Sequence, residues 1–134
     1  MIVAHGDRWR VYYTGRADVL GDLTIGLAEG TTPTEVAVLP ESPVFGWVEA
    51  EESWSGPAVA HPAVVQHPDG HWDMLYSTGY HRMGHAQSLD GVEWQRYCKN
   101  PVFVGRGGSS WEQGQVKSAD VVVHDGLYLM TYTG

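Results

Sequence analysis

A pattern of strand, turn and strand occupies residues 59–79, which read VAHPAVVQHPDGHWDMLYSTG. The apolar run at its start is followed by the turn signal Pro68-Asp69-Gly70 and then by a second run that is rich in aromatic residues. Short apolar runs bounded by Pro, Asp and Gly are typical of β-strands joined by a tight turn. The segment therefore predicts an antiparallel hairpin, with strands at about residues 58–66 and 71–77.

The same pattern is written three times in the chain. The copies end in Tyr12-Tyr13-Thr14-Gly15, Tyr76-Ser77-Thr78-Gly79 and Tyr132-Thr133-Gly134. The second and third copies align without a gap, which places Trp54 on Trp111 and His61 on Ser118. A strand pattern that recurs every 50 to 60 residues or so indicates the blades of a β-propeller or a related array.

Two more strands follow the hairpin of the middle copy, at about residues 83–88 and 93–97, joined by Leu89-Asp90-Gly91. An Asp-Gly pair between strands is a common hairpin signal, and four antiparallel strands from one segment make one propeller blade. The first copy predicts strands at about 9–14, 23–28 and 35–39, and the third copy supplies two strands. No segment shows helical periodicity. We therefore expect an all-β chain of about two and a half blades, with the middle copy as the complete unit.

The repeat is interrupted at both ends of the sequence, at Met1 and Gly134. The expectation is a single partial propeller domain with blade pieces at about 1–45, 54–103 and 111–134. Blade faces are apolar and normally pack on a neighbouring blade. We expect the uncovered faces either to receive the rest of a longer protein or to drive self-association.

The composition excludes several classes of partner. The 134 residues carry a net charge of −8 and no basic run, which argues against nucleic acids and anionic membranes, because both reward clustered Lys and Arg. No apolar run approaches the ~20 residues of a membrane span. The one cysteine, Cys98, excludes an internal disulfide. The compartment stays open.

Two segments resemble one group of enzymes. The run from Gly84 to Trp94 reads GHAQSLDGVEW, and residues 99–103 read KNPVF. These segments resemble the five-bladed β-propeller glycosidases of glycoside hydrolase families 43, 32, 62 and 68 and the family 130 phosphorylases. Trp54-Ser55-Gly56 together with residues 75–79 is similar to family 32 in particular. The resemblance implies a fragment of a five-bladed propeller, a carbohydrate ligand, hydrolysis of a glycosidic bond through channel carboxylates, and no cofactor.

The sequence departs from those families at their catalytic positions. The resemblance places catalytic carboxylates near the start of the first strand of a blade, in motifs such as Asp-Pro. Here the aligned pairs are His61-Pro62 and Ser118-Ala119, and in the first copy the position would precede Met1. Because glycoside hydrolysis uses a pair of carboxyl groups, we expect the chain alone to be inactive. The alternatives are a non-catalytic carbohydrate-binding or scaffold propeller and, third, a protein-binding propeller.

The candidate catalytic carboxylate is Asp120, and the candidate substrate-binding polar residues are His61 and Ser118. Asp120 lies two residues beyond Ser118, so strand alternation puts both side chains on one face. A histidine at position 61 can bind a sugar hydroxyl or exchange a proton near neutral pH. The alternatives are a structural Asp120 bonded to a neighbouring blade and a packed His61.

Trp54 and Trp111 are further candidates for substrate binding, since indole rings stack on the apolar faces of sugars; a repeated packing role is the alternative. Glu112 is expected to be a solvated loop residue. Four histidines fall on turns and separate strands at a spacing that matches no compact zinc motif, so no metal site is predicted. They are His67, His71, His81 and His85.

Overall fold

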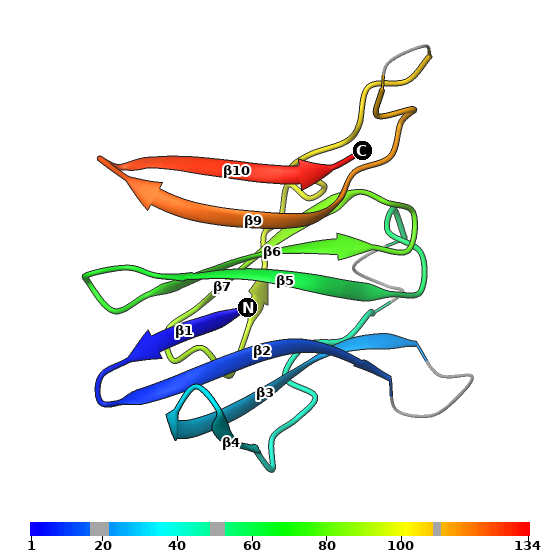
Figure 1. Ribbon diagram of the computed structural model, residues 1–134. Coiled ribbons are helices and arrows are strands. Elements are labelled where there is room, and N and C mark those ends of the chain that lie inside the picture. Colours follow the sequence, from blue (N-terminus) through cyan, green and yellow to red (C-terminus); the bar gives the residue numbers. More distant parts are fainter. Residues whose placement is uncertain (17–21, 49–52, 109–110) are drawn as a thin grey trace.

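The structure is a computed structural model that describes residues 1–16, 22–48, 53–108 and 111–134, and all its regular elements are β-strands (Figure 1). The first sheet contains β1 (Ile2–His5), β2 (Arg8–Arg16), β3 (Leu23–Thr32) and β4 (Glu35–Val38). The second contains β5 (Val59–Gln66), β6 (Trp72–Thr78), β7 (Met83–Ser88) and β8 (Gln95–Arg96). A hairpin of β9 (Lys117–His124) and β10 (Leu127–Thr133) follows. The expected all-β class is confirmed.

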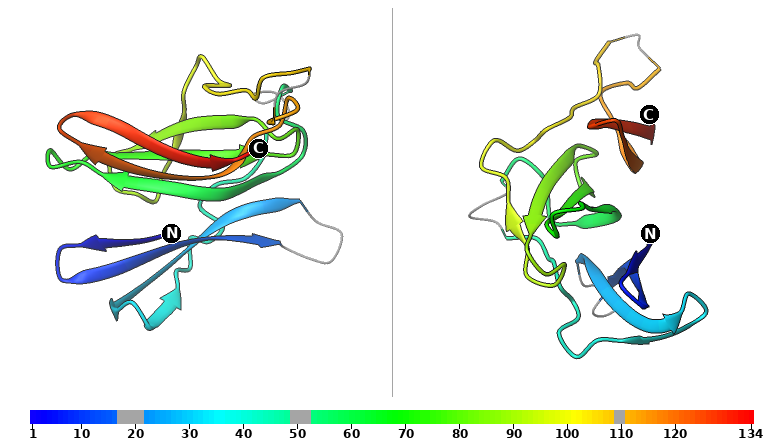
Figure 2. Two further views of the ribbon diagram at one scale, coloured as in Figure 1. Left: turned by 45° about the horizontal axis from the view of Figure 1, so that its top comes forward. Right: turned by 90° about the vertical axis from the view of Figure 1, so that its left-hand side faces the viewer.

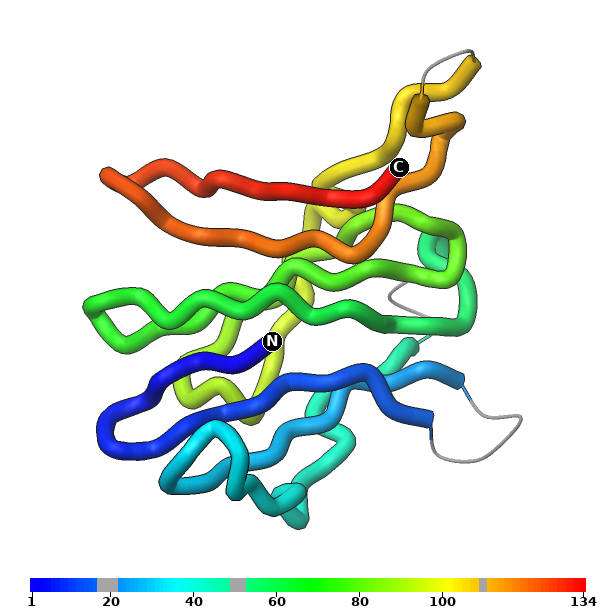
Figure 3. The backbone as a smooth tube through the Cα atoms, in the orientation of Figure 1, coloured from blue at the N-terminus to red at the C-terminus, as the bar shows by residue number. Residues whose placement is uncertain are grey.

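Each sheet is a meander in which sequential strands pair antiparallel. The sheets succeed one another in chain order (Figure 2), and the tube trace follows the chain through them (Figure 3). Two four-stranded sheets and one hairpin amount to two and a half propeller blades, as the repeat predicted. Within the described residues we find no helix that could cross a membrane.

The first sheet also has a first strand, so the expectation that the middle copy alone would be complete is wrong. β1 pairs with β2 from Ile2 opposite Val11 to His5 opposite Arg8. Met1 extends this ladder, because its amide oxygen and amino nitrogen each lie 2.9 Å from a backbone partner on Tyr12. The four residues of β1 can pair with β2 because a tight two-residue turn joins the strands, with Gly6 at a φ of 60°.

The third strand of the middle blade has the predicted bounds, Met83–Ser88, whereas the fourth is shorter than predicted. The Asp90 carboxylate is the reason. Its Oδ1 accepts the backbone N–H groups of Val92 at 2.8 Å and Glu93 at 2.9 Å. These bonds hold the backbone in a turn, so strand pairing resumes only at Gln95.

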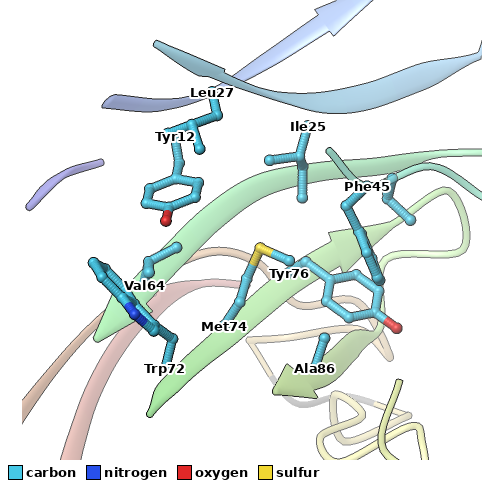
Figure 4. Close-up of a cluster of buried hydrophobic side chains, with 10 residues drawn as sticks. Tyr12, Ile25, Leu27, Phe45, Val64, Trp72, Met74, Tyr76 and Ala86 are labelled. Carbon is cyan, nitrogen blue, oxygen red and sulfur yellow. The ribbon is translucent and has the colours of Figure 1, made fainter. Parts of the chain in front are cut away.

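The main core lies between the first and second sheets, where side chains from both point toward each other (Figure 4). Tyr12 and Trp72 are fully buried there, with ring centroids 6.3 Å apart. The Tyr12 hydroxyl donates to the Gly91 carbonyl at 2.8 Å, so the phenol also fixes the β7–β8 turn. The cluster contains Tyr12, Ile25, Leu27, Phe45, Val59, Val64, Trp72, Met74, Tyr76 and Ala86.

The two complete sheets repeat each other in detail. The Ser42 hydroxyl bonds both the N–H and the carbonyl of Leu27, and the Asn100 amide does the same to His85. Phe45 and Phe103, a few residues later, each bridge back to the third strand of their own sheet. The recurring Pro-Val-Phe segment therefore closes each blade at the same point.

Candidate functional site

His61 on β5 and Ser118 on β9 share an unusual backbone conformation. Their φ angles are 50° and 52°, and each lies where the strand register shifts. The N–H of His61 donates to Thr14 Oγ1 at 2.8 Å, and that of Ser118 donates to Ser77 Oγ at 2.9 Å. In both cases the acceptor is on the second strand of the preceding sheet. The two residues are therefore structural equivalents, as the gapless alignment predicted.

This conformation frees the side chains at these positions. A bulge leaves one residue unpaired in the ladder and re-aims its side chain, and histidine is among the residues that tolerate positive φ. Ala60 and Pro62 are buried, whereas His61 between them is exposed. Ser118 is also exposed. Both side chains consequently leave the core and stand free on the first strand of their blade.

Asp120 is exposed on β9, two residues beyond Ser118. Burial lowers the pKa of the Met1 amino group, and the Asp120 carboxylate opposes that shift. The carboxylate therefore lies near the start of β1, which the register explains. Met1 just before β1, Ala63 on β5 and Asp120 on β9 occupy equivalent positions in three successive sheets. Their partners on the second strands are Tyr12, Leu75 and Thr131, respectively.

β5 and β9 are neighbouring first strands of successive blades (Figure 1). They expose His61 on one strand and Ser118 and Asp120 on the other. A shared sugar-binding surface formed by these three residues remains a prediction.

The two candidate tryptophans differ in their surroundings. Trp111 is 65% exposed and stacks on Tyr132, with ring centroids 5.5 Å apart and 25° between the planes. Trp54 is half-buried and packs against the core cluster, and its carbonyl accepts from Arg82 Nη1 at 3.2 Å. Of the two indoles, that of Trp111 is the one free to stack on a ligand.

Glu112 is buried, so the expectation of a solvated loop residue is wrong. Its Oε1 accepts the Tyr132 hydroxyl and its Oε2 the Arg106 N–H, both at 2.5 Å. These hydrogen bonds, that from Tyr132 first, lower the pKa of Glu112. The carboxylate thus ties the loop before β9 to β10, a structural role.

A second polar cluster, which the sequence analysis did not predict, surrounds Asp73 on β6. Asp73 Oδ1 accepts from His85 Nε2 at 2.7 Å and Gln87 Nε2 at 3.1 Å. Asp73 Oδ2 lies 2.8 Å from His67 Nε2 and accepts the Tyr128 hydroxyl at 2.6 Å. Burial raises the pKa of Asp73, but the hydrogen bonds, led by that of Tyr128, outweigh it and lower the pKa to about 2.

The cluster borders a pocket of about 350 Å³ between the second sheet and the β9–β10 hairpin. Asp73, His85, Gln87 and Tyr128 are its polar wall, and the remaining lining is apolar. One sequence signal could have found it, because Asp73 is a carboxylate inside the apolar and aromatic run of residues 72–76. A charge in such a run must find partners.

Comparisons with known proteins support the fold alone. No protein-family model matches the chain, and no curated protein matches it. Solved structures do. A GH32 β-fructofuranosidase of Bombyx mori superposes with a TM-score of 0.70 at 20% identity, covering 98% of this chain and 28% of that one. A glycoside hydrolase gives 0.74 at 24% identity, covering 97% of this chain and 42% of its own.

A glycosyl hydrolase from Bacteroides ovatus gives a TM-score of 0.64 at 18% identity, covering 98% of this chain and 42% of that one. The chain therefore spans less than half the length of each of these enzymes. Its fold is that of part of a glycosidase β-propeller, which confirms the expected fold class.

Proposed function

We propose that this chain is part of a carbohydrate-active five-bladed β-propeller that cleaves or transfers a glycosyl group. The observation that carries the proposal is the likeness to glycoside hydrolases over nearly the whole chain. The exposed polar residues of β5 and β9 support it, because first strands line the central channel of a propeller. A likeness of fold does not by itself assign an activity, so the proposal also depends on these side chains.

Their chemistry suits a sugar. Glycosidases use two carboxyl groups, one that protonates the leaving oxygen and one that acts as nucleophile or base. Strands β1, β5 and β9 offer one carboxylate between them, Asp120. In this proposal Asp120 is one member of the pair, and the second comes from another part of the propeller. His61 and Ser118 hydrogen-bond sugar hydroxyls, and Trp111 stacks on a ring face.

The second candidate function is carbohydrate binding without hydrolysis. It is favoured by the same two positions, since His61 and Ser118 stand where the similar families carry acids. Neither an imidazole nor a hydroxyl replaces a carboxylate that must form a glycosyl intermediate or activate water.

Calorimetric titration of the purified chain with oligosaccharides tests the shared premise of both functions. A mutant of the Bombyx mori enzyme has been solved in complex with sucrose, so the panel begins with sucrose and fructo-oligosaccharides and continues with arabinosides and xylosides. We expect Trp111→Ala and Asp120→Asn to weaken binding about tenfold or more. Trp9→Ala, which removes an indole from β2, is the matched control and should change nothing. Failure of every sugar to bind would contradict the premise.

Product analysis on the same panel separates the two functions. We expect no turnover by the chain alone. Turnover that is abolished by Asp120→Asn would show instead that this chain holds a working catalytic carboxylate.

A further inference from the structure

The cluster around Asp73 is remote from the channel residues. His67 follows the last residue of β5, whereas His61 is near the strand's beginning. At about 3.3 Å per residue, the two ends are separated by roughly 16 Å or more. Any role of this cluster is therefore distinct from sugar binding at His61.

Three possible donor atoms lie close together here, at spacings that suit a small cation. His67, His71 and Asp73 each offer one ligand atom, and the three atoms all lie within 4.8 Å of one another. The carboxylate oxygen is 2.8 Å from the first nitrogen and 3.7 Å from the second. A tetrahedral Zn²⁺ with ligand bonds of about 2.1 Å places its donors about 3.4 Å apart. The two measured distances bracket that value.

The neighbours of these donors are arranged as an outer shell around a metal would be. Asp69 Oδ1 lies 2.5 Å from His71 Nδ1, so Nδ1 carries the proton and Nε2 keeps its lone pair. His85 and Gln87 donate to Asp73 Oδ1. Asp73 Oδ2 accepts the Tyr128 hydroxyl and lies 2.8 Å from His67 Nε2, so a bound cation would replace the His67 proton on that side of Oδ2. Carboxylate–histidine pairs and fixed carboxylates of this kind orient metal ligands.

Burial is graded across the site. The Asp73 side chain is 9% exposed, that of His67 13% and that of His71 35%. The buried Asp73 carboxylate would bind an ion in a region of low dielectric constant, and the more exposed His71 imidazole would let the ion enter from solvent. The rings of His67 and His71 are stacked, with centroids 4.0 Å apart and 8° between the planes. They must tilt for both nitrogens to point at one ion.

The repeat supplies an independent reason to expect a cation. Arg10 on β2 and Asp73 on β6 occupy equivalent positions in their sheets. Arg10 lies opposite Glu29 on the third strand, and Asp73 lies opposite Gln87. The guanidinium of Arg10 lies 5.2 Å from the ring of Trp72, whose counterpart on β10 is Tyr128. The first sheet thus places a positive charge, the Arg10 guanidinium, between the blades. The second sheet has a carboxylate and imidazoles at the equivalent position.

We propose that His67, His71 and Asp73 bind a divalent transition-metal ion, Zn²⁺ foremost. Two imidazole nitrogens and one carboxylate oxygen are a ligand set for zinc rather than for calcium or magnesium, which take oxygen ligands. Solvent occupies the fourth position, on the side of His71. Because Tyr128 bonds Asp73 Oδ2, the ion fastens the β5–β6 turn against β10.

Titration of the full, metal-free chain with Zn²⁺ tests the proposal. We expect one ion per chain, with the affinity lowered tenfold or more by His71→Ala and by a smaller factor by Asp69→Asn. His124→Ala is the matched control, since His124 also lies beside an aspartate, 3.4 Å from Asp125, but is fully outside the cluster. It should bind as the unchanged chain does. Equal affinity in His71→Ala and the unchanged chain, or no binding to the latter, would overturn the site.

A measurement without any substitution guards against variants that fold poorly. In the NMR spectrum of the unchanged chain, Zn²⁺ should shift the imidazole resonances of His67 and His71 and leave those of His61 and His124 in place. Shifts spread evenly over the histidines would overturn the proposal and leave the cluster as a hydrogen-bonded network.

Discussion

Replacing Gly84 by alanine should destabilise the chain, because the space beside this glycine is already filled. A Cβ at position 84 would lie 2.6 Å from Tyr76 Cε2 and closer still to Cζ. Tyr76 is 1% exposed and cannot yield freely. Its ring meets Phe45 at 4.9 Å, and its hydroxyl lies 3.2 Å from Asn100 Nδ2. Restoring an ordinary contact moves the ring by about 1 Å into this packed interface.

Overpacking of this kind costs about 1–3 kcal/mol. The intrinsic effect has the opposite sign, because alanine is favoured over glycine inside a strand by roughly 0.5–1 kcal/mol. The expected result is therefore a loss of about 1–2 kcal/mol in the free energy of unfolding, measured by urea denaturation. Gly107→Ala is the matched control, since nothing lies within 4 Å of its Cβ. Equal or greater stability of Gly84→Ala would refute the packing argument.

Two further outcomes are expected. The pKa of Asp73 is lowered to about 2 in the folded chain from 3.8 for an unperturbed aspartate, so its contribution to stability is complete above about pH 4 and is lost as the pH falls toward 2. In the presence of a chelator, Asp73→Asn should flatten the acid-side fall of Tm over that range, and an unchanged slope would contradict this. The β9–β10 hairpin exposes Val122, Leu127 and Leu129 by half or more, so the chain should self-associate in sedimentation experiments and Leu129→Lys should reduce the association. A monodisperse monomer at all concentrations would argue against it.

The strands were predictable because their signals are local. Apolar runs and Asp-Gly turns gave the hairpin of residues 59–79, and the third strand, Met83–Ser88, had its predicted bounds. β1 was underestimated as a strand because four residues with one partner carry little periodicity. The equivalence of His61 and Ser118 was also visible in the sequence, since it follows from a gapless alignment.

The non-local features were not predictable from the sequence. The positive φ of His61 depends on a hydroxyl of the preceding blade, 47 positions away in the chain. The cluster at Asp73 assembles from a turn and three strands, and its last member, Tyr128, is 55 positions from Asp73. Glu112 would be solvated by any local criterion, yet it is buried and accepts a hydrogen bond from Tyr132. In each case the deciding partner belongs to another sheet or hairpin.

At His61 and Ser118 the backbone N–H bonds a hydroxyl of the preceding blade, so the backbone and the side chain of each residue have separate roles. The backbone of His61 or Ser118 performs the adhesion between blades, and the side chain takes no share in it. Histidine in one blade and serine in the next accordingly occupy the same position with nearly the same φ angle. Under the proposed function, a substitution by another residue that tolerates positive φ would change what the side chain contacts and would keep the bond between the blades.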